Sequence, residues 1–284
     1  MADSSFRYAD RTVLVVLANG IKAFADVLTG IVLARLLSQN DFGSYRQLLL
    51  LFVTLAGLTG MGLPQALLFF VPRRRDRNAP AFVARIYIGI LSLTVPGVVI
   101  LGLFGERFSR AFENPGLGQL IWIGGLYPIG MLLGQCLPLL FLGLNRHMES
   151  ALATVSFSLL QGTSIILAAF LGGDLKTIIV VLGSVSCVIS VVSIGFTYSI
   201  MRKWKHNRTR GATAELMRYS LPLGAHSAIG NFNQRLDRFL ISFFFRPQVL
   251  AVYSVGAFAE PILSVLLDPI HRVLIPRFVE IDQS

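Results

Sequence analysis

Charged residues are scarce in this chain. Asp, Glu, Lys and Arg make up 14% of its 284 residues, and 54% of the residues are hydrophobic, whereas soluble domains average about 25% charged residues. One soluble core cannot bury so large an apolar fraction. The composition therefore excludes an ordinary soluble domain and predicts an integral membrane protein.

Cysteine is almost absent, and so are the signatures of catalysis. Cys136 and Cys187 lie in apolar stretches without the spacing of metal ligands, so we interpret them as small buried hydrophobic residues. The sequence has no phosphate-binding glycine loop with a Lys, no HExxH pair and no nucleophile elbow. We expect no cofactor, no metal and no enzymatic reaction.

Long hydrophobic stretches occupy most of the chain, separated by short polar or Gly/Pro-rich connections. Each is at least about 20 residues long, which is enough to cross about 30 Å of hydrocarbon as a helix. The predicted spans are residues 12–35, 44–71, 81–104, 117–143, 150–172, 176–201, 216–244 and 251–276. We therefore predict an all-α, polytopic membrane protein with about eight transmembrane helices.

Basic residues concentrate in alternate connections between these spans. The 25 Lys and Arg residues outnumber the 15 Asp and Glu residues. Their main groups lie at the N-terminus, after the second span (Arg73–Arg77) and after the sixth (202–210). Because positive loops stay in the cytoplasm, we expect a cytoplasmic N-terminus in the cell (inner) membrane. The outer connections hold few basic residues, Arg46 and Arg246 among them. This pattern argues against nucleic acid as a partner and favours membrane lipids.

Short sequence pairs recur at matching span boundaries, about six helices apart. The pairs are Arg7-Tyr8 with Arg218-Tyr219, Tyr45 with Tyr253, and Pro72-Arg73 with Pro276-Arg277. An even number of helices between the copies gives both copies the same orientation, which is the parallel repeat of many transporters. We predict a first six-helix lobe over residues 1–210 and the first two helices of an incomplete second lobe over residues 211–284. By this period, a complete protein would continue beyond Ser284.

Several charged residues lie inside the predicted spans. One charge at the centre of a membrane helix costs about 2.5–3.5 kcal/mol, so the whole set facing lipid would cost on the order of 20 kcal/mol, more than a typical domain's stability. We expect these side chains to face one another or a water-filled cavity. They are Lys22, Asp26, Arg235, Asp237, Arg238, Glu260 and Asp268.

Polar residues form one stripe on each of three spans. The stripes are Asn19, Lys22 and Asp26 in the first span, Asn231, Gln234, Arg235 and Arg238 in the seventh, and Glu260, Ser264, Asp268 and His271 in the eighth. Two interpretations remain open. The charges could form structural ion pairs, such as Lys22 with Asp26 or Asp237 with Arg238, or they could line a cavity that binds a polar ligand.

Small residues and proline cluster in the second span at Gly57, Gly60, Gly62 and Pro64. They indicate either close helix packing or a bend in the helix that moves during transport.

Two stretches resemble a known family. Leu33 to Arg74 contains an acidic-Phe-Gly-x-Tyr turn (Asp41 to Tyr45) and Gly-Leu-Pro-Gln-Ala-Leu (Gly62 to Leu67), and it resembles the first helical hairpin of bacterial polysaccharide transporters. These are the oligosaccharide flippases of the multidrug/oligosaccharidyl-lipid/polysaccharide exporter superfamily. Arg218 to Ile262, with Leu-Asp-Arg-Phe-Leu-Ile-Ser (Leu236 to Ser242), resembles the seventh and eighth helices of this family.

This resemblance implies two lobes that alternate access to a cationic cavity. The cavity would accept an undecaprenyl-diphosphate-linked oligosaccharide and move it across the cytoplasmic membrane for O-antigen, capsule or exopolysaccharide synthesis, with a polysaccharide polymerase as a further partner. We expect Arg235, Arg238 and Lys22 to hold the diphosphate, and Asn231 and Gln234 to meet sugar hydroxyls. The expected coupling or gating residues are Asp26, Asp237, Glu260 and Asp268.

Other functions remain as alternatives. The first is cation-coupled multidrug efflux in the same superfamily, and the second is a truncated remnant without transport activity. A membrane-bound glycan polymerase or ligase is less consistent with the sequence, because the outer connections are too short to form an active site.

Overall fold

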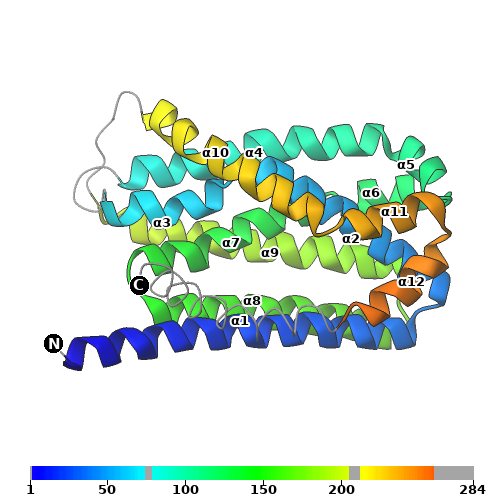
Figure 1. Ribbon diagram of the computed structural model, residues 1–284, viewed down its shortest axis with the longest axis horizontal. Coiled ribbons are helices and arrows are strands. Elements are labelled where there is room, and N and C mark those ends of the chain that lie inside the picture. Colours follow the sequence, from blue (N-terminus) through cyan, green and yellow to red (C-terminus); the bar gives the residue numbers. More distant parts are fainter. Residues whose placement is uncertain (1, 74–78, 205–211, 259–284) are drawn as a thin grey trace, which may run out of the picture.

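The computed structural model is all-α over the residues that it describes, 2–73, 79–204 and 212–258 (Figure 1). The fold class predicted from the sequence is therefore confirmed. The helices in these ranges are α1 (Ala2–Leu36), α2 (Gln39–Gly60), α3 (Leu63–Arg73), α4 (Ala79–Leu103), α5 (Gly105–Ala111), α6 (Leu117–Gly124), α7 (Leu126–Gly143), α8 (His147–Phe170), α9 (Leu175–Met201), α10 (Ala212–Asn233), α11 (Leu236–Phe244) and α12 (Pro247–Gly256).

Six stretches of helix in the described ranges are long and apolar enough to cross a membrane. They are Val13–Leu36, Gln39–Arg73, Ala79–Leu103, Leu117–Gly143, His147–Phe170 and Leu175–Met201, which confirms the first six predicted spans.

The expected total of about eight spans is not met within these ranges. The predicted seventh span is divided between α10 and α11. The predicted eighth begins earlier than expected, because Pro247 starts α12 at its first turn, and its residues from 259 onward lie outside the described residues.

The second predicted span is broken where its small residues cluster. Met61 and Gly62 both have positive φ angles, 43° and 67°, so the chain leaves the helix at the end of α2 and begins again at α3. A Cβ on Gly62 would lie 3.1 Å from the Leu223 side chain of α10, and a Cβ on Gly224 would lie 2.6 Å from the Met61 backbone. The break therefore serves close packing between α2–α3 and α10.

The long helices pack side by side. Helix α1 packs mainly on α8, whereas α7 contacts α2, α3, α8 and α9. Helix α10 crosses α2, α3 and α4 (Figure 1). Near the start of α10, the Tyr219 ring stacks on Phe69 of α3 with the ring centroids 4.3 Å apart, so α10 is fixed to the first six spans.

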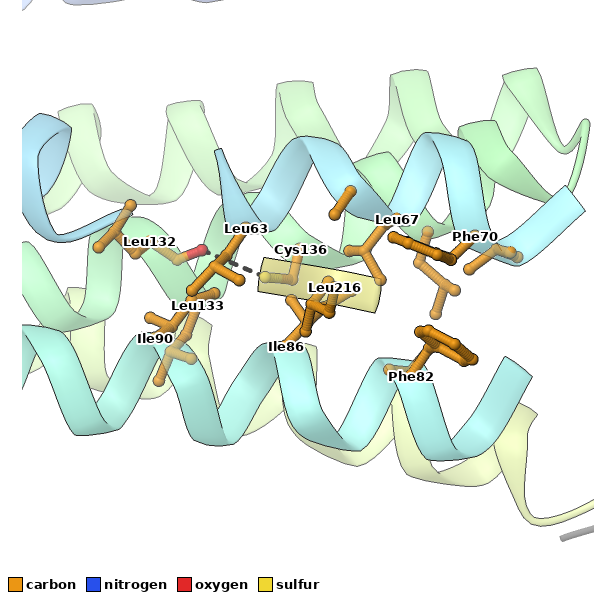
Figure 2. Close-up of a cluster of buried hydrophobic side chains, with 14 of the residues drawn as sticks. Leu63, Leu67, Phe70, Phe82, Ile86, Ile90, Leu132, Leu133, Cys136 and Leu216 are labelled. Atoms are coloured by element: carbon orange, nitrogen blue, oxygen red, sulfur yellow. Dashed lines mark hydrogen bonds between the residues drawn. The ribbon is translucent and has the colours of Figure 1, made fainter. Parts of the chain in front are cut away.

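The largest hydrophobic cluster joins α3, α4 and α7, with Leu216 from α10 (Figure 2). Cys136 is buried in it, and its Sγ lies 3.4 Å from the Leu132 carbonyl oxygen, which confirms its interpretation as a small hydrophobic residue. The same interpretation is wrong for Cys187. It is exposed on α9, beside exposed Val188 and Val191, because this face of the helix packs on no other described helix and suits contact with lipid.

The start of α12 packs closely on the start of α2. A Cβ added to Gly43 would lie 2.0 Å from the Pro247 carbonyl oxygen, so this crossing requires glycine. The Gln39 side chain donates to the Gln248 carbonyl oxygen (3.3 Å), and the Gln248 side chain donates to Asn40 Oδ1 (2.9 Å). We call this contact the α2–α12 junction.

Candidate functional site

A cavity of about 640 Å³ lies between α1 and α8 on one side and α2, α3, α7 and α9 on the other. Its size is in the range of small-molecule sites, which is about 300–1,000 Å³. Polar side chains contribute much of its wall. They are Asn19, Lys22, Asp26, Thr29, Tyr45, Arg46, Gln65, Tyr127, Gln135, Thr154, Ser158, Gln161 and Ser186.

The stripe predicted on the first span lines this main cavity. Lys22 Nζ lies 3.0 Å from Asp26 Oδ2, one helical turn away, so the expected pairing is confirmed. The two side chains are 51% and 60% exposed, and both line the cavity. The pair is therefore accessible from the cavity, and ligand binding by it stays a prediction.

Arg46 of α2 also lines the main cavity, although the sequence analysis assigned it to an outer connection. Ser38 caps α2 by accepting a hydrogen bond from the Asp41 N–H at 3.1 Å, so the helix begins at Gln39 and Arg46 lies two turns inside it. The guanidinium carbon of Arg46 is 5.8 Å from the Phe42 ring centroid and 5.4 Å from that of Phe258. The Ser-x-x-Asp capping pattern is the sequence signal that could have found this residue.

A smaller cavity of about 150 Å³ adjoins the first. Arg46 and Leu49 line both cavities, and Arg235 and Arg238 line the smaller one together with Leu250 and Ser254. Three guanidinium groups, from α2, from the break before α11 and from the first turn of α11, therefore border adjoining spaces. Guanidinium is permanently charged and presents a planar set of donors that matches phosphate, so this place suits an anionic group.

The other predicted residues of the seventh span lie elsewhere. Arg235 Nη1 donates to both oxygen atoms of Asn231, at 3.0 Å to the carbonyl oxygen and 3.1 Å to Oδ1. The Asn231 side chain packs on α2. A Cβ added to Gly57 would lie 3.4 Å from Asn231 Nδ2. Gln234 is exposed, and neither Asn231 nor Gln234 lines either of the two cavities.

The predicted acidic residues are only partly described. Asp26 lines the main cavity, and half-buried Asp237 accepts a hydrogen bond from the Tyr253 hydroxyl, which joins α11 to α12. Glu260, Asp268 and the rest of the predicted eighth-span stripe lie outside the described residues. In the described part of the chain, no group of three or more His, Cys, Asp and Glu residues has the arrangement of a metal site.

One end of the main cavity is closed by an apolar cluster. Tyr45, Ile165 and Leu182 belong both to the cavity wall and to a buried cluster with Leu33 and Ala251. Gly30 lies at this same end, since Gly30 and Arg46 both lie against Phe258. This cluster therefore borders the end of the cavity that holds Arg46.

Comparisons with known proteins agree with this architecture. Residues 9–282 match the family model described as polysaccharide biosynthesis protein. A solved MOP superfamily transporter from Pyrococcus furiosus, described as having a binding pocket of reverse polarity that suggests a different function, matches with a TM-score of 0.58 and 16% identity. That match covers 90% of this chain and 67% of the other, and it shows the shared fold.

A curated relative comes from Haemophilus influenzae, where it is a protein of the Lsg locus. The two are 24% identical over 224 residues, which cover 69% of this chain and 55% of the relative, so the chain spans about half of that protein's length. The family match extends over nearly all of the chain and agrees with the resemblance noted in its sequence. This membrane protein, which has the fold of a MOP superfamily transporter, belongs to the polysaccharide biosynthesis protein family.

Proposed function

We propose that this protein moves a lipid-linked oligosaccharide across the cytoplasmic membrane for the synthesis of O-antigen, capsule or exopolysaccharide. The observation that carries the proposal is the placement of Arg46, Arg235 and Arg238 around two adjoining cavities. This arrangement would hold the diphosphate that links lipid and sugar, because a guanidinium group can donate two parallel hydrogen bonds to the oxygen atoms of a phosphate. The family match supports a substrate used in polysaccharide synthesis.

The proposed architecture has two lobes in one orientation. Residues 1–210 would form the first lobe, and residues 211–284 would begin the second, with α10–α11 as the seventh span and α12 as the start of the eighth. With the N-terminus in the cytoplasm of an inner-membrane protein, the apolar cluster beside Arg46 would close the outer end of the cavity. The described arrangement would then be the state that is closed to the outside.

The partners of this activity are an undecaprenyl-diphosphate-linked oligosaccharide, the surrounding membrane lipids and a polysaccharide polymerase that receives the translocated unit. Lys22 remains a proposal for the diphosphate, with less support because Asp26 pairs with it at 3.0 Å. Asp26 and Asp237 are the described acidic residues proposed for coupling or gating, together with Glu260 and Asp268. Asn231 and Gln234 remain proposals for the sugar, with less support because they line neither cavity.

Complementation tests the proposal. A bacterial strain without its own flippase would receive the full-length gene, either unchanged or with Arg46, Arg235 and Arg238 all replaced by Gln. We expect the unchanged gene to restore surface polysaccharide and the triple variant to fail at equal membrane levels of the protein. Arg35→Gln is the control, because Arg35 is exposed and lines neither cavity. Full surface polysaccharide from the triple variant would contradict the proposal.

The same strain distinguishes the alternatives. Resistance to cationic dyes without restored polysaccharide would favour cation-coupled drug efflux. No phenotype from the gene that encodes this chain, with the protein present in the membrane, would favour a remnant without transport activity. Arginines beside the cavity favour an anionic substrate over a cationic drug, since like charges repel.

A further inference from the structure

The main cavity has a second polar region at the end away from Arg46. Asn19 precedes Gly30 by eleven residues on α1, and Thr154 precedes Ile165 by the same interval on α8. At 1.5 Å per residue, each interval spans about 16 Å. The two helices run alongside each other in register, because a Cβ on Gly162 would lie 2.8 Å from Thr29 Oγ1. Asn19 and Thr154 therefore share the end opposite the arginines.

Two glutamines lie at this same end. Ser150 at the start of α8 donates to the Pro138 carbonyl oxygen at 2.8 Å, which places Gln135, one turn before Pro138, at the level of the first turns of α8. Helix α3 follows α7 in the same direction, since Gly60 packs on Leu132 and Gly143 on the Leu67 carbonyl oxygen. Gln65 thus lies at this end as well.

The carboxamides of Asn19, Gln65 and Gln135 are exposed on the cavity wall, and they make no hydrogen bond within the described ranges. Gln161, deeper in the cavity, differs from them. Its Nε2 donates to the Leu182 carbonyl oxygen at 3.2 Å, and its Oε1 accepts from Ser186 at 3.0 Å. Gln161 therefore connects helices, whereas the other three amides keep their donors and acceptors available to a ligand.

Charge at this end is balanced. Lys22 lies one turn from Asn19, and Asp26 neutralises it at 3.0 Å. Three carboxamides suit an uncharged part of a ligand that carries many hydroxyl groups. Each amide offers two hydrogen-bond donors and an acceptor, and a hydroxyl group can both donate and accept a hydrogen bond. The apolar ring of Phe157, one turn from Thr154, adds a flat surface to the same wall.

We propose that Asn19, Gln65 and Gln135 form a sugar-recognition site at the end of the cavity opposite the arginines, and that they determine which sugar is accepted beside the diphosphate. This inference rests on the proposed function and deepens it. It moves sugar recognition from the seventh helix, where the sequence stripe suggested it, to α1, α3 and α7. The separation of about 16 Å leaves room for a diphosphate at one end and sugar at the other.

Binding measurements on the purified full-length protein test the proposal. The probes are a short-chain prenyl diphosphate and the same compound carrying glucose, galactose or N-acetylglucosamine. The variant is Gln65→Met with Gln135→Met, which keeps side-chain size and removes the hydrogen bonds. The matched control is Gln119→Met, at an exposed glutamine of α6 outside both cavities.

We expect the unchanged protein and Gln119→Met to bind at least one sugar-bearing probe more tightly than the bare diphosphate. The double variant should reduce this preference by about 5-fold for each lost hydrogen bond, with the affinity for the bare probe unchanged, which also shows that the variant is folded. A preference for sugar that is kept in the double variant, or absent from the unchanged protein, would overturn the proposal. No binding of any probe by the unchanged protein would overturn the proposed function itself.

Discussion

Arg46 lines both cavities. Its guanidinium carbon lies 5.4 Å from the Phe258 ring centroid and 5.8 Å from that of Phe42, so the planar group is oriented by aromatic neighbours. Lysine cannot reproduce this geometry or bind phosphate with two parallel hydrogen bonds. We predict that Arg46→Lys weakens binding of a prenyl diphosphate by about 10-fold, the cost of roughly one charge-assisted hydrogen bond. Arg35→Lys is the control, and an equal loss in both variants would count against this role.

Asp174 makes a separate, pH-dependent contribution at the start of α9. Hydrogen bonds from the Thr177 hydroxyl (2.7 Å) and then from the Thr177 backbone N–H (2.9 Å) lower the pKa of Asp174. The ionised carboxylate is thus the form that caps the helix. Its contribution is complete above the ordinary pKa of about 3.9 and is lost as the pH falls through the lowered value.

We therefore predict that Asp174→Ala lowers Tm by a constant amount between about pH 7 and pH 5, and that the difference from the unchanged protein shrinks below about pH 4. Thermal unfolding in detergent across this pH range measures it. A difference that grows on acidification would show that another group is responsible.

Residue patterns in the sequence predicted part of the site. The spacing of Lys22 and Asp26 was sufficient to predict their pairing, because residues four positions apart lie on the same face of an α-helix. The role of Arg46 was missed because it depends on where Ser38 starts α2. The three free carboxamides could not be predicted, since they come from three helices and share a wall only through tertiary packing.

At the scale of elements, the α2–α12 junction depends on packing more than on charge. The Arg246–Glu113 ion pair beside it has an N–O distance of 3.8 Å, with side chains 80% and 64% exposed, and such pairs contribute about 0–1 kcal/mol. The Gly43 contact with Pro247 leaves no room for a methyl group. Overpacking of this kind costs about 1–3 kcal/mol.

We predict that Gly43→Ala lowers the thermal stability of the purified protein, whereas Glu113→Gln changes it little. The matched control is Gly195→Ala on α9, where nothing lies within 4 Å of an added Cβ. This control should be neutral or slightly stabilising, because alanine favours helix over glycine by about 1 kcal/mol. Equal losses at Gly43 and Gly195 would contradict the packing explanation.

Hydrophobic length predicted the first six spans well, because a span must match the thickness of the hydrocarbon. Helix breaks were less predictable. The small residues near Gly62 were compatible with two interpretations, close helix packing and a bend. The structure shows both a positive φ angle at Gly62 and close packing of α10 against it. The break at 234–235 carries no glycine or proline, so no local residue pattern predicted it.

For the whole molecule, the central claim is that ionised and polar side chains at membrane depth line a wet cavity that holds an anionic head group. The Lys22–Asp26 pair, whose side chains are 51% and 60% exposed, is consistent with this claim. A dry interior would instead require these groups to be sealed in pairs, because an unpaired charge away from water is costly.

Thiol labelling in membranes tests this claim most directly. In a background with Cys136→Ala and Cys187→Ser, a cysteine at Thr154 faces the cavity, whereas one at Thr163 is exposed on α8 outside both cavities, where lipid would cover it. We predict that a charged, membrane-impermeant thiol reagent labels Thr154→Cys but not Thr163→Cys, and that a lipid-linked oligosaccharide slows the labelling. An unreactive cysteine at position 154, or a reactive one that this substrate never protects, would contradict the account.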